Sequence, residues 1–316
     1  MPSRHTVTAF FTGVGVTLAT GAAAGTGISR FLSRRNAAAA DLNALLPVHS
    51  AWWRDRFDRK GHLLYVAMGD SAAQGIGASS PARSYVGRLS AYIRRTNHTS
   101  LRMVNLSVSG STTWLCRKDQ LPKFEKYQPD IVTVAIGAND IIQFNPESFE
   151  KNIRAIYGAL PSHAIVGDLP AMWIPDREKK LVEANAIVRR VAGEFGLTVA
   201  PLYETTRSQG FFRTYRNSAG DLFHPNDRGY RVWASAFEPA IAARLARIAA
   251  DEAATAHEAR EAEAVAAHTA ATTATPASQP GTAATSPRAA SPQKTATAGG
   301  AVSSPTDASS DVGGAS

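Results

Sequence analysis

The chain has 316 residues, of which 44% are hydrophobic, and this is enough to build a substantial core. The net charge of +8 favours anionic surfaces, but the basic residues stand singly or in pairs, without the long run or stripe of a nucleic-acid binder. The single cysteine, Cys116, excludes an internal disulfide and a cysteine-based zinc cluster, and the eight histidines lack a metal-ligand spacing, so we expect neither a metal nor another cofactor.

Residues 1–35 predict a signal peptide or a membrane anchor. Residues 6–29 carry no charged side chain and contain the apolar run AFFTGVGVTLATGAAAG, although many glycines and threonines make it a poor spanning helix. Arg30, Arg34 and Arg35 follow, and the positive-inside tendency would place the rest of the chain in the cytoplasm. We expect a secreted or envelope-associated protein, with a cytoplasm-facing anchor as the alternative.

Between residues 51 and 250, apolar runs of strand length alternate with helical periodicities. Strands are predicted at Leu63–Met68, Leu101–Leu106, Ile131–Ile136, Ala164–Val166 and Leu197–Ala200. Helices are predicted over 86–93, 149–160, 181–195 and 230–248, the last beginning after a Pro-Asn pair. This alternation predicts an α/β domain whose parallel five-stranded sheet is covered on both faces.

Polar motifs follow the first three predicted strands. They are GDS at 69–71, SVSGS at 107–111 and GAND at 137–140. In a parallel α/β sheet, binding and catalysis take place beyond the carboxyl ends of the strands, where the strand order reverses. If the order is 2-1-3-4-5, Ser71 lies between Gly110 and Asn139.

Ser71 is a candidate nucleophile, because the segment GDLFHPND offers the base that a serine hydroxyl needs. Asp221 and His224 are three residues apart, so that a turn can bring the carboxylate to the imidazole and fix its tautomer. The backbone N–H groups of Ser71 and Gly110 and the Asn139 amide are candidate oxyanion donors. Each motif alone has a structural alternative, such as a turn glycine or a capping asparagine.

Together and in this order, the four motifs resemble the four blocks of the SGNH, or GDSL-type, esterase and lipase family. The resemblance covers residues 63–245. It implies a three-layer α/β/α, flavodoxin-like fold. It also implies a set of site residues, with a nucleophile, two triad partners and two further oxyanion donors: Ser71, Asp221, His224, Gly110 and Asn139.

The serine block departs from the family at one position, and it excludes other serine signatures. Ala72 replaces the family's frequent leucine, which affects packing more than chemistry. The sequence does not match the nucleophile elbow G-x-S-x-G, because position 73 is alanine. It does not match GDSGG either, because positions 72 and 73 are both alanine. The dinucleotide fingerprint fails because GIGASS at 75–80 lacks the third glycine.

Two further sets of residues lie near these motifs. Asp70 and Asp140 have no proton to move, so we expect them to fix their turns through hydrogen bonds. The loop DLPAMWIPD follows the fourth predicted strand, and its apolar side chains are predicted to form a wall for an acyl chain or to pack under the next helix: Leu169, Met172, Trp173 and Ile174.

The expected function is that of a serine esterase or lipase, which hydrolyses a small-molecule or lipid ester through an acyl-enzyme. An acyltransferase or carbohydrate deacetylase would use the same triad, and a non-catalytic envelope binding protein is the alternative from another class. No nucleic-acid partner is expected, membrane or envelope association is possible, and the oligomeric state is open. Residues 269–316 lack aromatic, Leu, Ile and Met side chains, so we predict a disordered tail.

Overall fold

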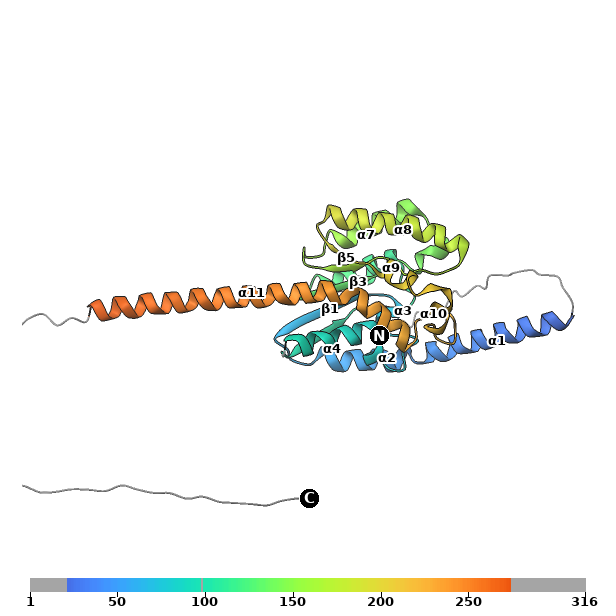
Figure 1. The fold of residues 1–316 in the computed structure, drawn as a ribbon, viewed down its shortest axis with the longest axis horizontal. Coiled ribbons are helices and arrows are strands. Elements are labelled where there is room, and N and C mark those ends of the chain that lie inside the picture. The colour runs from blue at the N-terminus through green and yellow to red at the C-terminus, as the bar shows by residue number, and fades with distance from the viewer. Residues whose placement is uncertain (1–21, 98, 274–316) are drawn as a thin grey trace, which may run out of the picture. The chain divides into compact units, whose positions relative to one another are not determined.

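The computed structural model describes residues 22–97 and 99–273, and its centre is one parallel sheet (Figure 1). The strand order is β2-β1-β3-β4-β5, as predicted. The five strands are β1 Leu63–Gly69, β2 Leu101–Asn105, β3 Ile131–Ala135, β4 Ile165–Gly167 and β5 Thr198–Ala200. The carboxyl end of each strand lies within one residue of the predicted end, because the apolar runs that predicted the strands are largely buried in the sheet.

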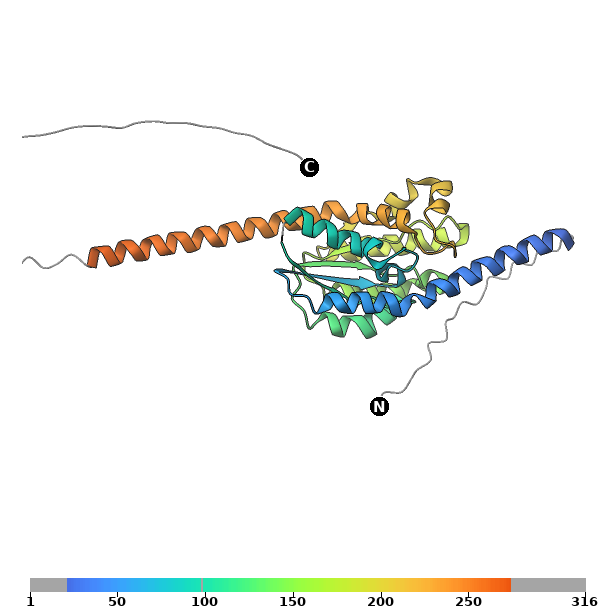
Figure 2. The same cartoon turned by 90° about the horizontal axis from the view of Figure 1, so that it is seen from below.

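Helices cover both faces of this sheet. Successive residues of β1 point to opposite faces, so Tyr65 and Ala67 belong to one apolar cluster and Val66 and Met68 to the other. The first cluster is completed by α2 (Leu46–Phe57), α4 (Tyr85–Asn97) and the beginning of α11 (Asp227–Thr273). The second is completed by α6 (Leu121–Phe124), α7 (Pro146–Tyr157) and α8 (Pro175–Glu194). The three-layer α/β/α fold is therefore confirmed, and Figure 2 views it from the side of α2 and α4.

Shorter helices follow the strand ends and supply the turns of the site. They are α3 Ser71–Gln74, η1 Pro81–Arg83, α5 Thr113–Leu115, the π-helix η2 Cys116–Gln120, η3 Asp140–Gln143, α9 Leu202–Arg207 and α10 Gly210–Arg216. The four long predicted helices are present as α4, α7, α8 and α11.

The folded unit includes α2, which begins before the predicted domain start at residue 51. Its apolar periodicity is weak, and besides the packing of Trp53 in the first cluster the helix makes polar contacts to one backbone carbonyl. The Trp53 indole N–H donates to the carbonyl of Gln74 at 3.0 Å, and His49 Nδ1 lies 3.2 Å from the same oxygen. A search for apolar stripes could not have found these contacts.

The chain divides into two units, Met1–Arg260 and Glu261–Ser316. Residues 1–21 of the predicted signal peptide or anchor, and 274–316 of the predicted tail, lie outside the described residues. The structure does describe residues 22–35 of the predicted signal peptide or anchor, and they form the first part of α1 (Ala22–Ala44). Residues 269–273 of the predicted tail form the last part of α11. Among the described helices, none combines the length and the hydropathy needed to cross a membrane. Both terminal assignments stay predictions.

Candidate active site

Ser71 lies beyond the carboxyl end of β1, which pairs with β2 on one side and β3 on the other, where the chain passes through Asp70 into α3. Asp70 is the N-cap of that helix, and its carboxylate accepts the backbone N–H of Ala72 at 2.9 Å. Ser71 is the first helical residue, and only 5% of it is exposed. The capped turn thus fixes the backbone that carries the hydroxyl.

The loop between α10 and α11 brings a histidine to this hydroxyl. His224 Nε2 lies 2.9 Å from Ser71 Oγ, and Nδ1 of the same ring lies 2.5 Å from Asp221 Oδ2. The other carboxylate oxygen of Asp221 accepts the backbone N–H groups of Phe223 and His224, both at 3.1 Å. These bonds close the turn over Leu222, whose φ is +58°. The predicted contact between Asp221 and His224 is therefore present, and it is built locally.

The charge of Asp221 determines which imidazole nitrogen carries the proton. Burial acts to raise the pKa of Asp221, but the hydrogen bond and charge of His224 and two backbone N–H groups outweigh it, so the pKa is lowered. An ionised carboxylate accepts a hydrogen bond from Nδ1–H. The lone pair of Nε2 then faces Ser71 Oγ, which is the arrangement a general base requires.

Asn139 follows β3, on the other side of Ser71. It occupies the N-cap position of η3, but its side chain makes no capping hydrogen bond. Instead, its Nδ2 donates to the backbone carbonyl of Ser111 at 2.9 Å and lies 3.4 Å from an Asp70 carboxylate oxygen. The helix-cap alternative therefore does not describe this side chain.

Gly110, after β2, has a φ of +76°, which favours glycine. A Cβ built there would meet no atom within 4 Å, so its backbone faces open space. Among the described residues, no group accepts the backbone N–H of Ser71 or of Gly110. The three predicted oxyanion donors thus follow three adjacent strands. Their convergence on one oxygen stays a prediction.

Gln120 is a polar residue of the site that sequence analysis missed. It is fully buried in the π-helix η2. Its Oε1 accepts the N–H of Gly69 at 3.1 Å, and its Nε2 donates to the Gly69 carbonyl at 2.8 Å and to Ser111 Oγ at 3.1 Å. One amide therefore ties the end of β1 to the residue whose carbonyl holds Asn139. No spacing motif marks this glutamine, because its partners are far away in the sequence.

Two carboxylates, the buried Asp70 and the half-buried Asp140, support the same turns, as expected. Burial raises the pKa of Asp70 to about 6, against the N–H of Ala72 and the charge of His224. Burial also raises the pKa of Asp140, whose oxygens accept the hydroxyl and backbone N–H of Thr113 at 2.6 and 2.9 Å. The turns after β2 and β3 are therefore joined by side-chain hydrogen bonds.

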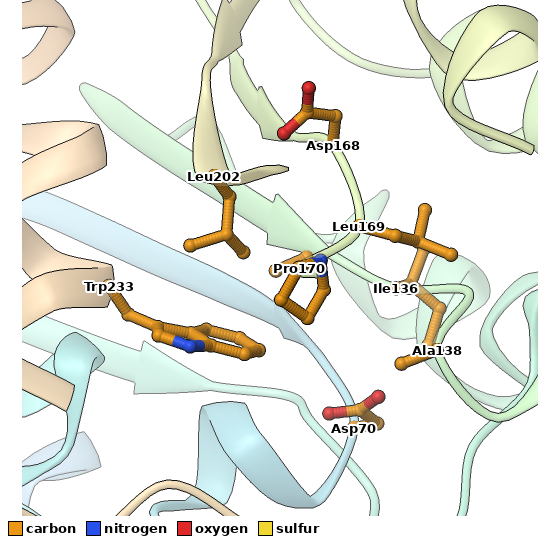
Figure 3. A pocket seen from close by; sticks show the side chains of 9 residues that line it. Asp70, Ile136, Ala138, Asp168, Leu169, Pro170, Leu202 and Trp233 are labelled. Carbon is orange, nitrogen blue, oxygen red and sulfur yellow. The ribbon is translucent and has the colours of Figure 1, made fainter. Parts of the chain in front are cut away.

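The four predicted substrate contacts in the loop after β4 differ in their burial. Leu169 is 2% exposed and packs in the second apolar cluster, whereas Met172 and Trp173 are half-buried and Ile174 is 45% exposed. A cavity of about 10 Å³ lies between this loop and Asp70, with room for about one water molecule (Figure 3). It cannot hold an acyl chain, so contact between these four residues and a substrate stays a prediction.

The model of the GDSL-like lipase/acylhydrolase family matches residues 67–232, and no curated protein sequence matches the chain. LAE5, an α/β hydrolase from the metagenome of Lake Arreo, Spain, is 24% identical, covering 58% of this chain and 97% of its own, with a TM-score of 0.49. Axe2, an acetylxylan esterase from Geobacillus stearothermophilus, is 17% identical over 57% and 94%, with a TM-score of 0.47. The lipase Lip_vut3 from a goat rumen metagenome is 19% identical over 56% and 97%, also with a TM-score of 0.47. Since the family model spans more than half of the chain, the protein belongs to the GDSL-like lipase/acylhydrolase family.

Proposed function

We propose that the protein is a serine esterase that hydrolyses carboxylic esters through an acyl-enzyme on Ser71. One observation carries this proposal. The imidazole of His224 lies between the Ser71 hydroxyl, at 2.9 Å, and the Asp221 carboxylate, at 2.5 Å. These distances suit a nucleophile, a general base and an orienting carboxylate, and membership of an acylhydrolase family supports the same chemistry.

The reaction has two balanced halves. Ser71 Oγ forms a bond to the ester carbonyl carbon while His224 Nε2 takes the hydroxyl proton. The tetrahedral intermediate collapses, the bond to the alcohol oxygen breaks, and His224 returns the proton to the leaving alcohol. Water then attacks the acyl-enzyme with the same histidine as base, and the carboxylic acid and free Ser71 are released.

The negative oxygen of each intermediate needs donors that are already in place. In this proposal the backbone N–H groups of Ser71 and Gly110 supply two of them. The Asn139 amide has two hydrogens, of which one is held by the Ser111 carbonyl at 2.9 Å. The other donates to an Asp70 carboxylate oxygen at 3.4 Å, a long hydrogen bond that the oxyanion would replace. That hydrogen is the third donor.

The same residues would serve an acyltransferase or a carbohydrate deacetylase, in which the acceptor or the alcohol differs. A non-catalytic binding protein has no need of a base on a buried serine, so the triad geometry argues against it.

Labelling with a fluorophosphonate probe tests the proposal, because the probe reacts with an activated serine. We expect labelling of the full chain and none of Ser71→Ala. Ser79→Ala is the matched control, since Ser79 Oγ bonds a carboxylate, Asp227, at 2.7 Å but has no imidazole beside it. Nitrophenyl esters from acetyl to palmitoyl, and acetylated sugars, would then define the acyl group and the alcohol. Undiminished labelling of Ser71→Ala would overturn the assignment.

A further inference from the structure

The short helix α10 lies at one end of the domain (Figure 1). It exposes three aromatic side chains. None of its residues is buried, and Phe211, Phe212 and Tyr215 are 54%, 82% and 54% exposed. Large apolar side chains that gather on a surface are typical of a binding site. With Arg213 and Arg216, which are also exposed, these residues form what we call the α10 surface.

The segment that contains this surface carries charged side chains of one sign only. Residues 205–220 contain three arginines and no carboxylate. Arg207 is occupied, because it pairs with Glu178 at 2.9 Å and lies over the ring of Trp173. Among the described residues, no carboxylate forms a salt bridge with Arg213 or Arg216. Two guanidinium groups thus remain available beside the aromatic rings.

The aromatic rings are supported on one side only. Phe211 packs edge-on against Trp173, with ring centroids 6.3 Å apart, and Phe212 packs against Phe211 at 5.6 Å. Trp173 itself is held in a left-handed conformation, with a φ of +58°. Phe211 is therefore anchored to the domain, whereas most of Phe212 extends into solvent.

The α10 surface is tied to the loop of the triad. The Asn226 side chain donates to the backbone carbonyls of Arg216 and Ser218, at 2.8 and 2.9 Å, and its backbone N–H donates to Asn217 at 2.8 Å. The exposed ring of Phe223, in the same loop, lies 5.0 Å from the ring of His224. Aromatic side chains are thus exposed both on α10 and beside His224.

We propose that the α10 surface binds anionic lipid, so that the ester substrate is an acyl lipid drawn from a lipid–water interface. Aromatic rings enter the headgroup region favourably, and arginines beside them bind phosphate, so the two side-chain types match one partner. A second copy of the chain is a poorer partner, because an isologous contact would bring the unpaired arginines of both copies together. The identity of the substrate rests on the proposed esterase function, whereas lipid binding does not.

Sedimentation with vesicles tests the lipid contact separately from catalysis, if the full chain carries Ser71→Ala. We expect binding to phosphatidylcholine vesicles that contain phosphatidylglycerol and much weaker binding to phosphatidylcholine alone. Phe212→Ala should weaken partitioning about tenfold, because an exposed ring can no longer enter the interface. Arg213→Glu with Arg216→Glu should weaken it about thirtyfold.

Matched controls come from the opposite end of the sheet. Phe195 is 40% exposed just before β5, and Arg95 is exposed near the end of α4. Phe195→Ala and Arg95→Glu should each weaken partitioning less than threefold, because both residues lie far from the α10 surface and the effect of a distant charge is screened by salt. Equal losses in these controls, or binding that does not depend on the anionic lipid, would overturn the proposal. So would a wild-type dimer that Phe212→Ala dissociates.

The consequence for the substrate is measured with active protein. Hydrolysis of an acyl ester embedded in anionic vesicles should fall in Phe212→Ala in proportion to the lost binding. If Ser71 failed to react with a fluorophosphonate while vesicle binding persisted, the esterase function would fail and the lipid contact would stand. If labelling persisted without vesicle binding, only the lipid contact would fail.

Discussion

The two sides of Ser71 are built in different ways. On the side of Asn139, groups from different segments bond one another, with the buried Gln120 linking the end of β1 to Ser111 in the loop after β2. On the side of His224, a single loop supplies both His224 and Asp221 and closes on itself through Asp221 and Asn226. The first side is held by tertiary contacts, whereas the second is shaped by its local sequence. Substitutions on the two sides should therefore affect different properties.

The largest effect is expected at the base. His224→Ala removes the proton acceptor of Ser71 and should lower kcat about 10⁶-fold, measured with a soluble nitrophenyl ester. His62→Ala is the matched control, because that imidazole also pairs with a carboxylate, Glu252, at 2.9 Å, but has no serine beside it. Retention of near-native turnover by the His224 variant would exclude this base.

The orienting carboxylate should contribute less than the base. Asp221→Asn keeps the shape of the loop but can present an amide N–H to the imidazole, which favours the wrong tautomer. We expect kcat to fall about 10⁴-fold. Circular dichroism should show an unchanged fold, because the oxygen that accepts Phe223 N–H and His224 N–H remains. A loss of less than tenfold would mean that the imidazole is oriented by other groups.

On the opposite side, the Asn139 amide acts on the transition state in our proposal. Asn139→Ala should lower kcat about 10²- to 10³-fold and leave KM almost unchanged, since the donor is needed only when the oxyanion forms. Asn139→Asp should be at least as damaging, because it places a negative charge where another must develop. An unchanged kcat with a lowered melting temperature would remove Asn139 from the site and leave it a structural role.

Gln120 should affect both stability and catalysis, because it positions other groups without touching the substrate. Gln120→Leu leaves the buried N–H of Gly69 without a partner and its carbonyl with the N–H of Val108 alone, which should cost about 1 to 3 kcal/mol of unfolding free energy. Well below the melting temperature, kcat should fall about 10- to 100-fold, since Ser71 and Asn139 lose their alignment. Gln120→Glu keeps the acceptor for Gly69 N–H and should recover part of the stability. A purely structural role predicts an unchanged kcat below melting.

The smallest effect concerns Asp70 and the pH dependence of folding. Burial raises its pKa to about 6, above the value of about 4 in the unfolded chain. Its contribution to stability is thus fully present below about pH 4 and is lost as the pH rises through about 6, by at most about 3 kcal/mol. Denaturant titrations between about pH 4 and pH 6 should show that the unfolding free energy of the wild type falls with pH relative to that of Asp70→Asn, by the same amount.

Asp227 provides a control of opposite sign. Burial acts to raise its pKa, but hydrogen bonds from Ser79 and the charges of Arg83 and Arg88 outweigh it, and the pKa is lowered. Its contribution is therefore present above about pH 4 and lost as the pH falls further. Asp227→Asn should leave the slope between pH 4 and 6 unchanged. If both variants changed it equally, the titration would not belong to Asp70.

Local patterns in the sequence determined most of the fold and one half of the candidate site. Apolar runs marked the five strands, because strands buried on both faces carry no polar alternation. The spacing of Asp221 and His224 predicted their contact, since a turn of three residues closes on its own backbone. The position of GDS directly after a strand predicted where Ser71 would lie.

Only the tertiary structure decided which distant groups meet. Ser71 and His224 are 153 residues apart, and their distance of 2.9 Å depends on how α11 packs on the sheet. Gln120 bonds Gly69 across 51 residues, and Trp53 of α2 reaches the Gln74 carbonyl, without any motif to mark either contact. The exposure of Phe212 could not be predicted either, because the sequence of a short helix does not indicate whether one of its aromatic residues is buried. Such contacts depend on how whole helices and strands pack together, and the sequence of a single segment does not specify that packing.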